Sequence, residues 1–322
     1  MQSLARCLMA AAAAAAFAFA SLSWAQTWPV RPIRLVVGFP PGGATDVVAR
    51  AFAPRLGEAL GQSIVIDNRP GAGGNIGLET VAKSTPDGYT LLKSASGAIV
   101  IGPHLYKLSV DVARDLLPVA PTMLTTLLLV VRPSLPVHSL AELIAYARAN
   151  PGKLSYGSSG IGSGLHIAGE MLAHEAKIKA THVPYKGAAL AITDLLGDRV
   201  DFMFDTAPVI PHIKANKLRL LAVARATRSR MFPDTPTMAE AGADVTVEFV
   251  QGVYAPAGTP REIVARLNRE MGRVMQSAEV LAVLAGIGAE PVTASPEEFA
   301  ALQRRERERF GAIVRKANIR VQ

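Results

Sequence analysis

The sequence has little of several residue types that mark whole classes of protein. It contains one cysteine, Cys7, which excludes a disulfide within the chain. Aromatic residues make up only 6% of the chain, too few for the stacking platforms of single-strand nucleic-acid binders. Charged residues make up 19%, which is too low for a disordered chain. After residue 25, no apolar run reaches the roughly 18 residues of a membrane span, so we expect no membrane insertion of the mature chain.

The composition that remains is that of a globular protein with a basic balance. Half of the 322 residues are hydrophobic, and at about 150 residues per domain this length predicts two domains. The net charge of +8 is compatible with nucleic acid, an anionic surface or a small anionic ligand. Because the basic residues are scattered and aromatics are few, we expect no nucleic-acid partner.

Residues 1–25 have the three parts of a secretory signal peptide. Arg6 precedes an apolar run from Leu8 to Ala20, and Ser23 and Ala25 are small residues at the −3 and −1 positions of a cleavage site. The apolar run spans only about 20 Å as a helix, against roughly 30 Å of membrane hydrocarbon, which argues against an anchor. We therefore expect export and cleavage after Ala25, which also removes the cysteine.

Short apolar runs then alternate with helical patterns along the chain. Strands are expected over 33–37, 63–66, 89–92, 127–131, 154–156, 182–183, 200–204 and 218–224, with helices over 45–60, 76–84, 139–149, 164–174 and 188–196. This order predicts an α/β protein with parallel sheets flanked by helices. Ser139, Thr259 and Ser295 are expected helix caps, and Pro54 is expected to kink or end the first helix.

Three glycine-rich turns lead from a strand into a helix. The turn 38–45 has the spacing of a phosphate-binding loop, but Ala44 replaces its lysine, so either an anion-binding turn or a plain tight turn fits. The turn 71–77 departs from a dinucleotide fingerprint in one spacing and is expected to be structural. The turn 157–164 offers N–H groups and three serine hydroxyls, and it lacks the G-x-S-x-G pattern of a hydrolase.

Other polar residues give weaker signals. His166 and Glu170 have a spacing that can hold a metal, but no third ligand follows, so a surface or capping role is favoured and no metal or cofactor is expected. Asp205 and Thr206 end an expected strand, and Tyr185, Lys186 and Gly187 form a strand-to-helix turn. Ligand contacts gather at such positions in α/β proteins.

Several motifs, taken together and in order, carry a family resemblance. They are Trp28-Pro29, Arg31-Pro32-Ile33, Phe39-Pro40-Pro41-Gly42-Gly43, the run from Asn68 to Gly77, Pro86-Asp87-Gly88-Tyr89, the run from His182 to Gly187, Phe204-Asp205, Pro211-His212-Ile213-Lys214, and the run from Ala255 to Pro260. The chain thereby resembles the Bug family, the periplasmic solute-binding receptors of tripartite tricarboxylate transporters. Pro54 and the segment Ala98-Ile99-Val100 depart from the family's pattern.

The resemblance implies a two-lobed, Venus-flytrap periplasmic-binding-protein fold (type II) in which each lobe has a mostly parallel sheet. It implies lobe 1 over 26–125 and 252–322 and an inserted lobe 2 over 126–251. It also implies a monomeric, non-enzymatic receptor in the periplasm that holds a small carboxylate and delivers it to membrane permease subunits. A receptor that passes its liganded form to a signalling partner is the alternative, and an exported hydrolase is a weaker one.

The resemblance also implies a set of ligand-binding residues, taken from both lobes. They are Gly42, Gly43, Ala44, Thr45, Asp46, Ser96 and Gly97 in lobe 1, and Ser158, Ser159, Gly160, Ser163, Tyr185, Lys186, Gly187, Asp205 and Thr206 in lobe 2. No arginine lies in the turns 38–46 and 157–164, so we expect backbone N–H groups to hold the carboxylate. Lys186 then mainly steers encounter, and Gly43→Val is expected to distort the first turn if Gly43 has a positive φ.

Overall fold

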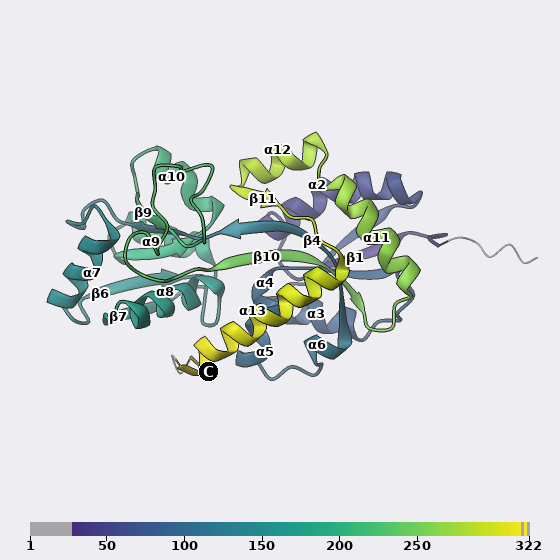
Figure 1. The fold of residues 1–322 in the computed structure, drawn as a ribbon, viewed down its shortest axis with the longest axis horizontal. Coiled ribbons are helices and arrows are strands. Elements are labelled where there is room, and N and C mark those ends of the chain that lie inside the picture. Colours follow the sequence, from purple (N-terminus) through teal and green to yellow (C-terminus); the bar gives the residue numbers. More distant parts are fainter. Residues whose placement is uncertain (1–27, 317–318, 321–322) are drawn as a thin grey trace, which may run out of the picture.

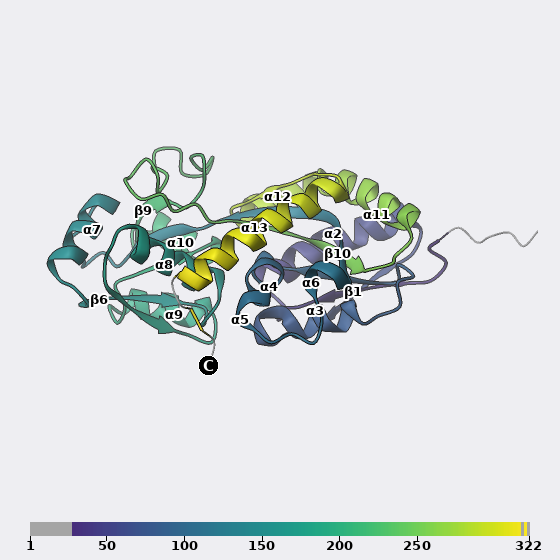
Figure 2. The ribbon, with the colours of Figure 1, turned by 60° about the horizontal axis from the view of Figure 1, so that its bottom comes forward.

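The computed structural model describes residues 28–316 and 319–320. It has two lobes, each built on one sheet, which lie side by side along the long axis of the molecule (Figures 1 and 2). The expected signal peptide lies outside the described residues. Within them, no helix is long and apolar enough to cross a membrane.

The first lobe is built on a six-stranded sheet with the strand order β11-β4-β10-β3-β1-β2. Its strands are β1 (Ile33–Val37), β2 (Ile64–Asn68), β3 (Thr90–Ser94), β4 (Leu116–Thr126), β10 (Glu248–Pro256) and β11 (Ala289–Pro291). Strand β1 pairs in parallel with β2 and β3, whereas β10 pairs antiparallel with β3 and β4, as does β11 with β4.

Helices cover both faces of this sheet, because successive side chains along each strand point to opposite faces and most of them are apolar. Leu35 and Val37 face α2 (Ala44–Leu60), α11 (Arg261–Val274) and α12 (Ala278–Gly286), while Val36 faces α3 (Asn75–Ala82) and α13 (Pro296–Lys316). The short elements of this lobe are η1 (Ala72–Gly74), α4 (Ser96–Val100), α5 (Gly102–Leu105) and α6 (Val112–Asp115).

The second lobe is built on a five-stranded sheet with the order β7-β6-β8-β5-β9. Its strands are β5 (Leu128–Val131), β6 (Leu154–Ser158), β7 (Ala180–Pro184), β8 (Phe202–Asp205) and β9 (Arg219–Val223), and its helices are α7 (Leu140–Ala149), α8 (Gly164–Glu175), α9 (Ala188–Leu196), η2 (Ala207–Val209) and α10 (Ile210–Lys214). Strand β6 is parallel to β7 and β8, and β5 is antiparallel to β8 and β9.

The prediction of mostly parallel sheets is therefore wrong in detail, because both sheets are mixed. The inserted lobe explains this. The chain leaves the six-stranded sheet along β4, enters the second sheet at β5 after Leu127, and returns along β10. Outgoing and returning strands that lie next to each other must run antiparallel. Both long strands are seen passing between the lobes in Figure 1.

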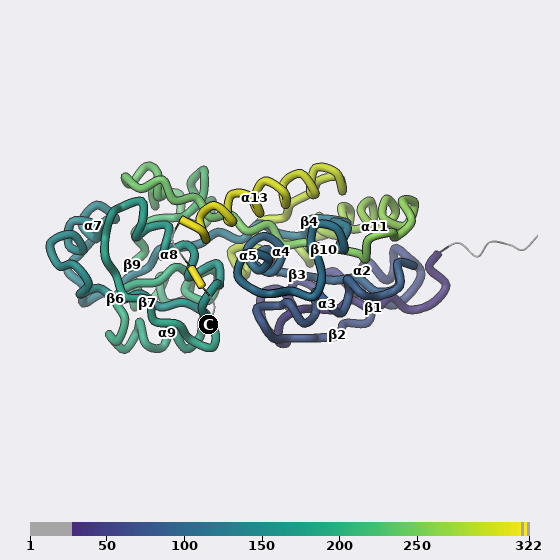
Figure 3. The backbone as a smooth tube through the Cα atoms, turned by 90° about the horizontal axis from the view of Figure 1, so that it is seen from below, coloured from purple at the N-terminus to yellow at the C-terminus, as the bar shows by residue number. Residues whose placement is uncertain are grey.

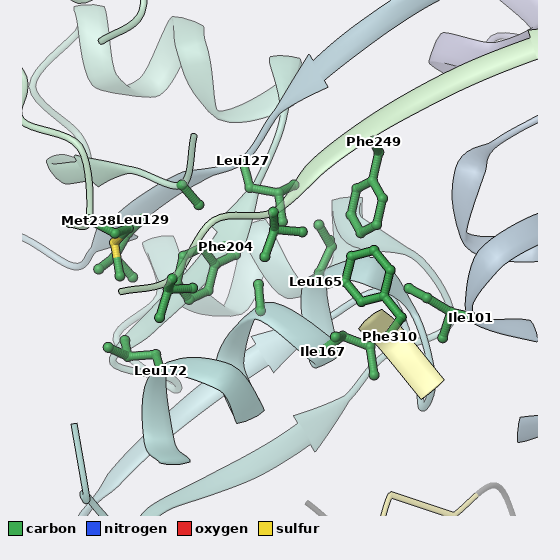
Figure 4. Packing of buried hydrophobic residues seen from close by; sticks show 14 of the residues in the cluster. Ile101, Leu127, Leu129, Leu165, Ile167, Leu172, Phe204, Met238, Phe249 and Phe310 are labelled. Carbon is green, nitrogen blue, oxygen red and sulfur yellow. The ribbon is translucent and has the colours of Figure 1, made fainter. Parts of the chain in front are cut away.

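Apolar side chains from both lobes form one cluster near these connecting strands. Phe249 of β10 stacks on Phe310 of α13 with ring centroids 5.6 Å apart, and Leu165 of α8 and Ile101 belong to the same cluster (Figure 4). Helix α13 contacts α4 in the first lobe and α8 in the second, and it lies along both lobes in Figure 3. The relative position of the lobes is thus held by packing as well as by the connecting strands.

Several local predictions are tested by the structure. Ser139 and Ser295 cap α7 and α13, each accepting a hydrogen bond from the N–H three residues later at 3.1 Å. The cap predicted at Thr259 is wrong, because its hydroxyl donates to the carbonyl of Pro256 instead. Of the two outcomes predicted at Pro54, a kink or an end of the helix, the end is wrong, since α2 continues past Pro54 to Leu60.

Candidate ligand site

The loops that carry the expected site residues follow the carboxyl ends of parallel strands in each lobe. In the first lobe these strands are β1 and β3, and in the second they are β6, β7 and β8. Carboxyl ends of parallel strands meet at one edge of a sheet, which is where open α/β sheets bind ligands. The structure therefore brings the expected residues together as two groups, one in each lobe.

The first glycine-rich turn ends at the N-terminus of α2. Gly42 has a φ of 81° and Gly43, the N-cap residue, has a φ of −73° with no side-chain cap. The condition of a positive φ at Gly43 is therefore not met, and the left-handed position of this turn is Gly42. The N–H groups of Ala44, Thr45 and Asp46 lie in the first turn, where no earlier helical carbonyl can accept from them. They are donors at the positive end of a 17-residue helix.

Asp46 fixes the shape of this turn. Its carboxylate accepts hydrogen bonds from Gly42 N (2.9 Å), Asn68 Nδ2 (2.9 Å) and Arg50 Nε (2.8 Å). Burial by itself raises the pKa of Asp46, but the hydrogen bonds from Arg50, Asn68 and Gly42 outweigh it and hold that pKa below its ordinary value. Both carboxylate oxygens are engaged, so Asp46 positions the turn.

The second glycine-rich turn supports the first by close backbone packing. A Cβ atom at Gly77 would lie 2.9 Å from Gly38 Cα, and one at Gly38 would lie 3.0 Å from Gly74 O. Only glycine allows this approach. The contacts agree with the structural role expected for the turn 71–77.

Thr45 leads to two residues that the sequence patterns missed. Its hydroxyl donates to Gln251 Oε1 (3.1 Å), and the same oxygen accepts from Lys93 Nζ (2.9 Å). Lys93 is fully buried near the end of β3. A lysine directly after the apolar pair Leu91-Leu92 was the only sequence signal for it. Ser96 and Gly97 follow in the first turn of α4, where Ser96 is buried and a Cβ at Gly97 would meet nothing within 4 Å.

The third glycine-rich turn is fastened by Ser158. The Ser158 hydroxyl accepts from Gly160 N (3.2 Å) and contacts His182 Nε2 (2.7 Å). Gly160 has a φ of 130°, and Ser163 is the N-cap of α8, accepting from His166 N at 3.3 Å. Ser159 lies between Ser158 and Gly160 and is half-buried.

A stack of rings lies beneath this turn. His166 and His182 are parallel with centroids 3.8 Å apart, and Tyr156 stacks on His182 at 4.9 Å. Burial lowers the pKa of His166 to about 4. Burial and the neighbouring His166 together lower the pKa of His182 to about 4, so both imidazoles are neutral at pH 7. Gly162 N donates to His166 Nδ1 (3.0 Å).

His166 therefore positions the third turn. Its other ring nitrogen, Nε2, is 3.7 Å from Glu170 Oε1. Within residues 28–316 and 319–320, no three His, Cys, Asp or Glu side chains are grouped to hold a metal ion.

The contact between Ser158 and His182 resembles part of a hydrolase site, but its surroundings differ. Ser158 has no exposed surface, and its hydroxyl is occupied by Gly160 as well as by His182. A nucleophilic serine must reach the substrate with a hydroxyl that its base activates. Ser158 instead holds the third turn in place through its hydrogen bonds to Gly160 and His182.

The remaining expected residues lie at the ends of β7 and β8. Tyr185 donates to Asp194 Oδ2 (2.8 Å), and burial together with this bond raises the pKa of Tyr185 to about 12. Lys186 is exposed, and Gly187 is the N-cap of α9 with a φ of 130°. These residues place a second helix N-terminus close to the third turn, since Tyr185 N donates to Ser158 O at 3.0 Å.

Asp205 is buried at the end of β8. Its Oδ1 accepts from Thr206 N (2.7 Å), whereas Oδ2 has no partner in the described part of the protein. Burial raises the pKa of Asp205 to about 6. A buried carboxyl oxygen without a partner, at the carboxyl edge of a sheet, is a candidate position for a hydrogen bond to a ligand or water.

Two contacts bring the third turn and the start of α8 against the first lobe. Tyr106, which follows α5, places its hydroxyl 3.4 Å from the carbonyl oxygen of Ile161 in the third turn. At Gly164, a Cβ atom would lie 2.3 Å from the Phe249 ring on β10, so the start of α8 lies directly against a strand of the other sheet. The third turn thus lies next to the first lobe.

Known proteins share both the sequence and the fold. The family model described as tripartite tricarboxylate transporter family receptor matches residues 48–319. Protein BugT of Bordetella pertussis is 40% identical over 304 residues, which cover 92% of each chain. A Rhodopseudomonas palustris protein solved with adipate is 40% identical with a TM-score of 0.82, covering 91% of this chain and 99% of its own.

A second solved relative is MatC from Rhodopseudomonas palustris with bound malate. It is 32% identical with a TM-score of 0.79, and the match covers 89% of this chain and all of that one. The two-lobed α/β fold and the family resemblance predicted from the sequence are confirmed. This chain belongs to the tripartite tricarboxylate transporter family of receptors.

Proposed function

We propose that this protein is an extracytoplasmic solute-binding protein that captures a small carboxylate between its two lobes and delivers it to the permease of a tripartite tricarboxylate transporter. The observation that carries this proposal is the pair of loop groups at the carboxyl edges of the two sheets. Each group contains a glycine-rich turn that leads into the N-terminus of a long helix, α2 or α8. Helix N-termini with free N–H groups are suited to anions.

The residues proposed to contact the ligand are those expected from the sequence, with one division of roles. In the first turn the N–H groups of Ala44, Thr45 and Asp46 face the carboxylate, and in the third turn those of Ser159 and Ile161 do, together with the hydroxyls of Thr45 and Ser159 and the loops 96–97, 185–187 and 205–206. The N–H groups of Gly42, Gly160 and Gly162 donate within the turns and hold their shape. Asp46 and Ser158 act through the turns that they hold, because their own polar atoms are engaged. The lobes are proposed to close about the connections that leave β4 and enter β10.

Binding is tested by thermal denaturation of ligand-stripped protein against mono-, di- and tricarboxylates and amino acids. Adipate and malate are included because relatives at 40% and 32% identity were solved with them. A ligand at 100 times its Kd stabilises the folded state by about 2.7 kcal/mol, which raises the melting temperature measurably. If no carboxylate raises the melting temperature, the proposed function is wrong.

The mature protein is proposed to be periplasmic and to begin at Gln26. Cleavage after Ala25 removes the apolar run and leaves a chain without cysteine. The intact mass of the protein released from the periplasm should therefore equal that of residues 26–322. A mass that includes residues 1–25 would contradict the cleavage prediction.

Two other functions remain to be distinguished. A receptor that signals through a partner would have the same ligand site. Affinity purification of the liganded protein distinguishes the two functions: capture of permease subunits supports transport, and capture of a sensor protein supports signalling. A hydrolase is disfavoured by the complete burial of Ser158. Turnover of a generic ester that is lost in Ser158→Ala would support hydrolysis.

A further inference from the structure

Lys93 is a charged residue in a position that is unfavourable for a cation. It lies on β3 between β1 and β10, in the middle of the six-stranded sheet, and its side chain has no exposed surface. Lysine is almost never fully buried unless an acid pairs with it. In the described residues, however, no carboxylate lies within 4.0 Å of its ammonium group: Lys93 Nζ donates to an uncharged partner, Gln251 Oε1, at 2.9 Å.

The N-terminus of α2 adds to this unfavourable environment. Gln251 Oε1 also accepts from Thr45 Oγ1 in the first helical turn, so Lys93, Gln251 and Thr45 form one chain of hydrogen bonds. The start of a helix carries a partial positive charge. Burial alone lowers the pKa of Lys93 to about 7. A cation and a helix N-terminus placed together disfavour each other, and both favour an anion.

A β-bulge in the pairing of β4 with β10 lies at Gln251 and affects the direction of its side chain toward Lys93 and Thr45. In the pairing of β10 with β4, Gln251 lies opposite Met123 and Gly252 lies opposite Pro121, so Thr122 is an extra residue on β4. The Thr122 hydroxyl donates to Gln251 O at 3.1 Å. Bulges of this kind redirect side chains and are frequent beside binding sites. Here the bulge lies on strands that connect the two lobes.

A purely structural role explains these contacts poorly. Methionine has nearly the length of lysine and would fill the same space without the cost of burying a charge. Gln251 would keep its hydrogen bond from Thr45 in that case. Unpaired buried charges with a shifted pKa gather at functional sites.

We propose that Lys93, held by Gln251, is a specificity-determining residue that offsets a second negative charge on the ligand, so that the protein prefers dicarboxylates to monocarboxylates of the same length. This inference rests on the proposed function, because it assigns the charge of the ligand that the same site takes. The glycine-rich turns supply uncharged donors for one carboxylate, and the ammonium form of Lys93 adds a positive charge that is joined to Thr45 through Gln251.

The test compares matched dianions and monoanions by titration calorimetry. The probes are adipate against hexanoate, and succinate against butyrate, on wild-type protein and on Lys93→Met. We expect wild type to prefer the dianion, and Lys93→Met to reduce that ratio of affinities by roughly tenfold or more, which corresponds to about 1.4 kcal/mol. Lys153→Met, which removes an exposed lysine just before β6, should leave the ratio unchanged.

A second variant tests the same charge without removing the lysine. Gln251→Glu is almost isosteric and places a carboxylate against Lys93 Nζ, so it should also reduce the preference for dianions. An unchanged ratio in both variants overturns the inference. If wild type binds monocarboxylates alone, the inference fails while the proposed function stands, and if it binds no carboxylate at all, both fail.

Discussion

Gly160→Val is expected to weaken carboxylate binding by roughly 100-fold or more, the largest loss expected for a single substitution in the third turn. Gly160 has a φ of 130°, which side chains other than glycine rarely adopt, and a Cβ atom there would lie 3.3 Å from the backbone oxygen of Tyr185. Its N–H and carbonyl groups hold Ser158 and Ser163, so the turn must change shape. A hydrogen bond to a charged group contributes about 1.5–3 kcal/mol, and loss of two reaches this magnitude.

Two control variants separate loss of the turn from loss of the fold or of surface charge. Gly242→Val carries a similar backbone penalty, since φ is 99°, but it lies in an exposed loop and should leave the dissociation constant unchanged. Lys186→Met removes an exposed charge and should cost about tenfold or less. Titration calorimetry on variants that are shown to be folded measures these dissociation constants. If Lys186→Met abolishes binding and Gly160→Val does not, side-chain charge rather than the backbone holds the carboxylate.

The sequence was sufficient for those features that depend on local patterns. Short apolar runs located β1, β2 and β3 in the first lobe and the five strands of the second, and glycine-rich turns located the N-termini of α2 and α8. The capping serines at 139 and 295 were predicted because their hydroxyl and the glutamate three residues later act within one helical turn. Local hydrogen bonding of this kind does not depend on the rest of the fold.

Features that depend on distant pairing were missed. The strands β4 and β10 pair across more than 100 residues of sequence, and neither was expected, because prolines such as Pro118 and Pro121 hide β4. The bond between Lys93 and Gln251 spans 158 positions and depends on that pairing and on its bulge. The same limit applies to the stacked His166 and His182, which come from a helix and from a strand.

Pro54 shows the opposite case, in which a strong local rule fails. Proline inside a helix removes one hydrogen bond and crowds the preceding turn, which costs about 3 kcal/mol or more. Helix α2 nevertheless continues, and its buried residues on both sides of Pro54, Phe52, Ala53 and Leu56, pack into one core. Burial of a large side chain stabilises by about 1.5–3 kcal/mol, so a few such contacts outweigh the proline.

Lys93→Met is expected to stabilise the ligand-free protein at pH 7 by several kcal/mol, although it weakens dicarboxylate binding. Burial lowers the pKa of Lys93 from 10.5 to about 7 in the folded protein. Between these values the unfolded chain binds a proton that the folded protein has lost, so the free energy of unfolding rises with pH. At about 1.4 kcal/mol per pKa unit, the protonated lysine costs on the order of 4–5 kcal/mol below pH 7. Loss of the bond to Gln251 offsets only about 1 kcal/mol.

Urea denaturation between pH 7 and pH 10 measures this difference directly. Wild-type stability should rise toward that of Lys93→Met as the pH increases. By pH 10 the gap should be close to zero, because the remaining cost of the protonated lysine, about 1 kcal/mol, is offset by the bond to Gln251 that the variant lacks. Lys153→Met should follow the wild-type curve, because its lysine is exposed. If Lys93 served only to hold Gln251, Lys93→Met would be less stable than wild type at every pH. That result would contradict the argument that the buried charge destabilises the ligand-free protein and is retained for ligand binding.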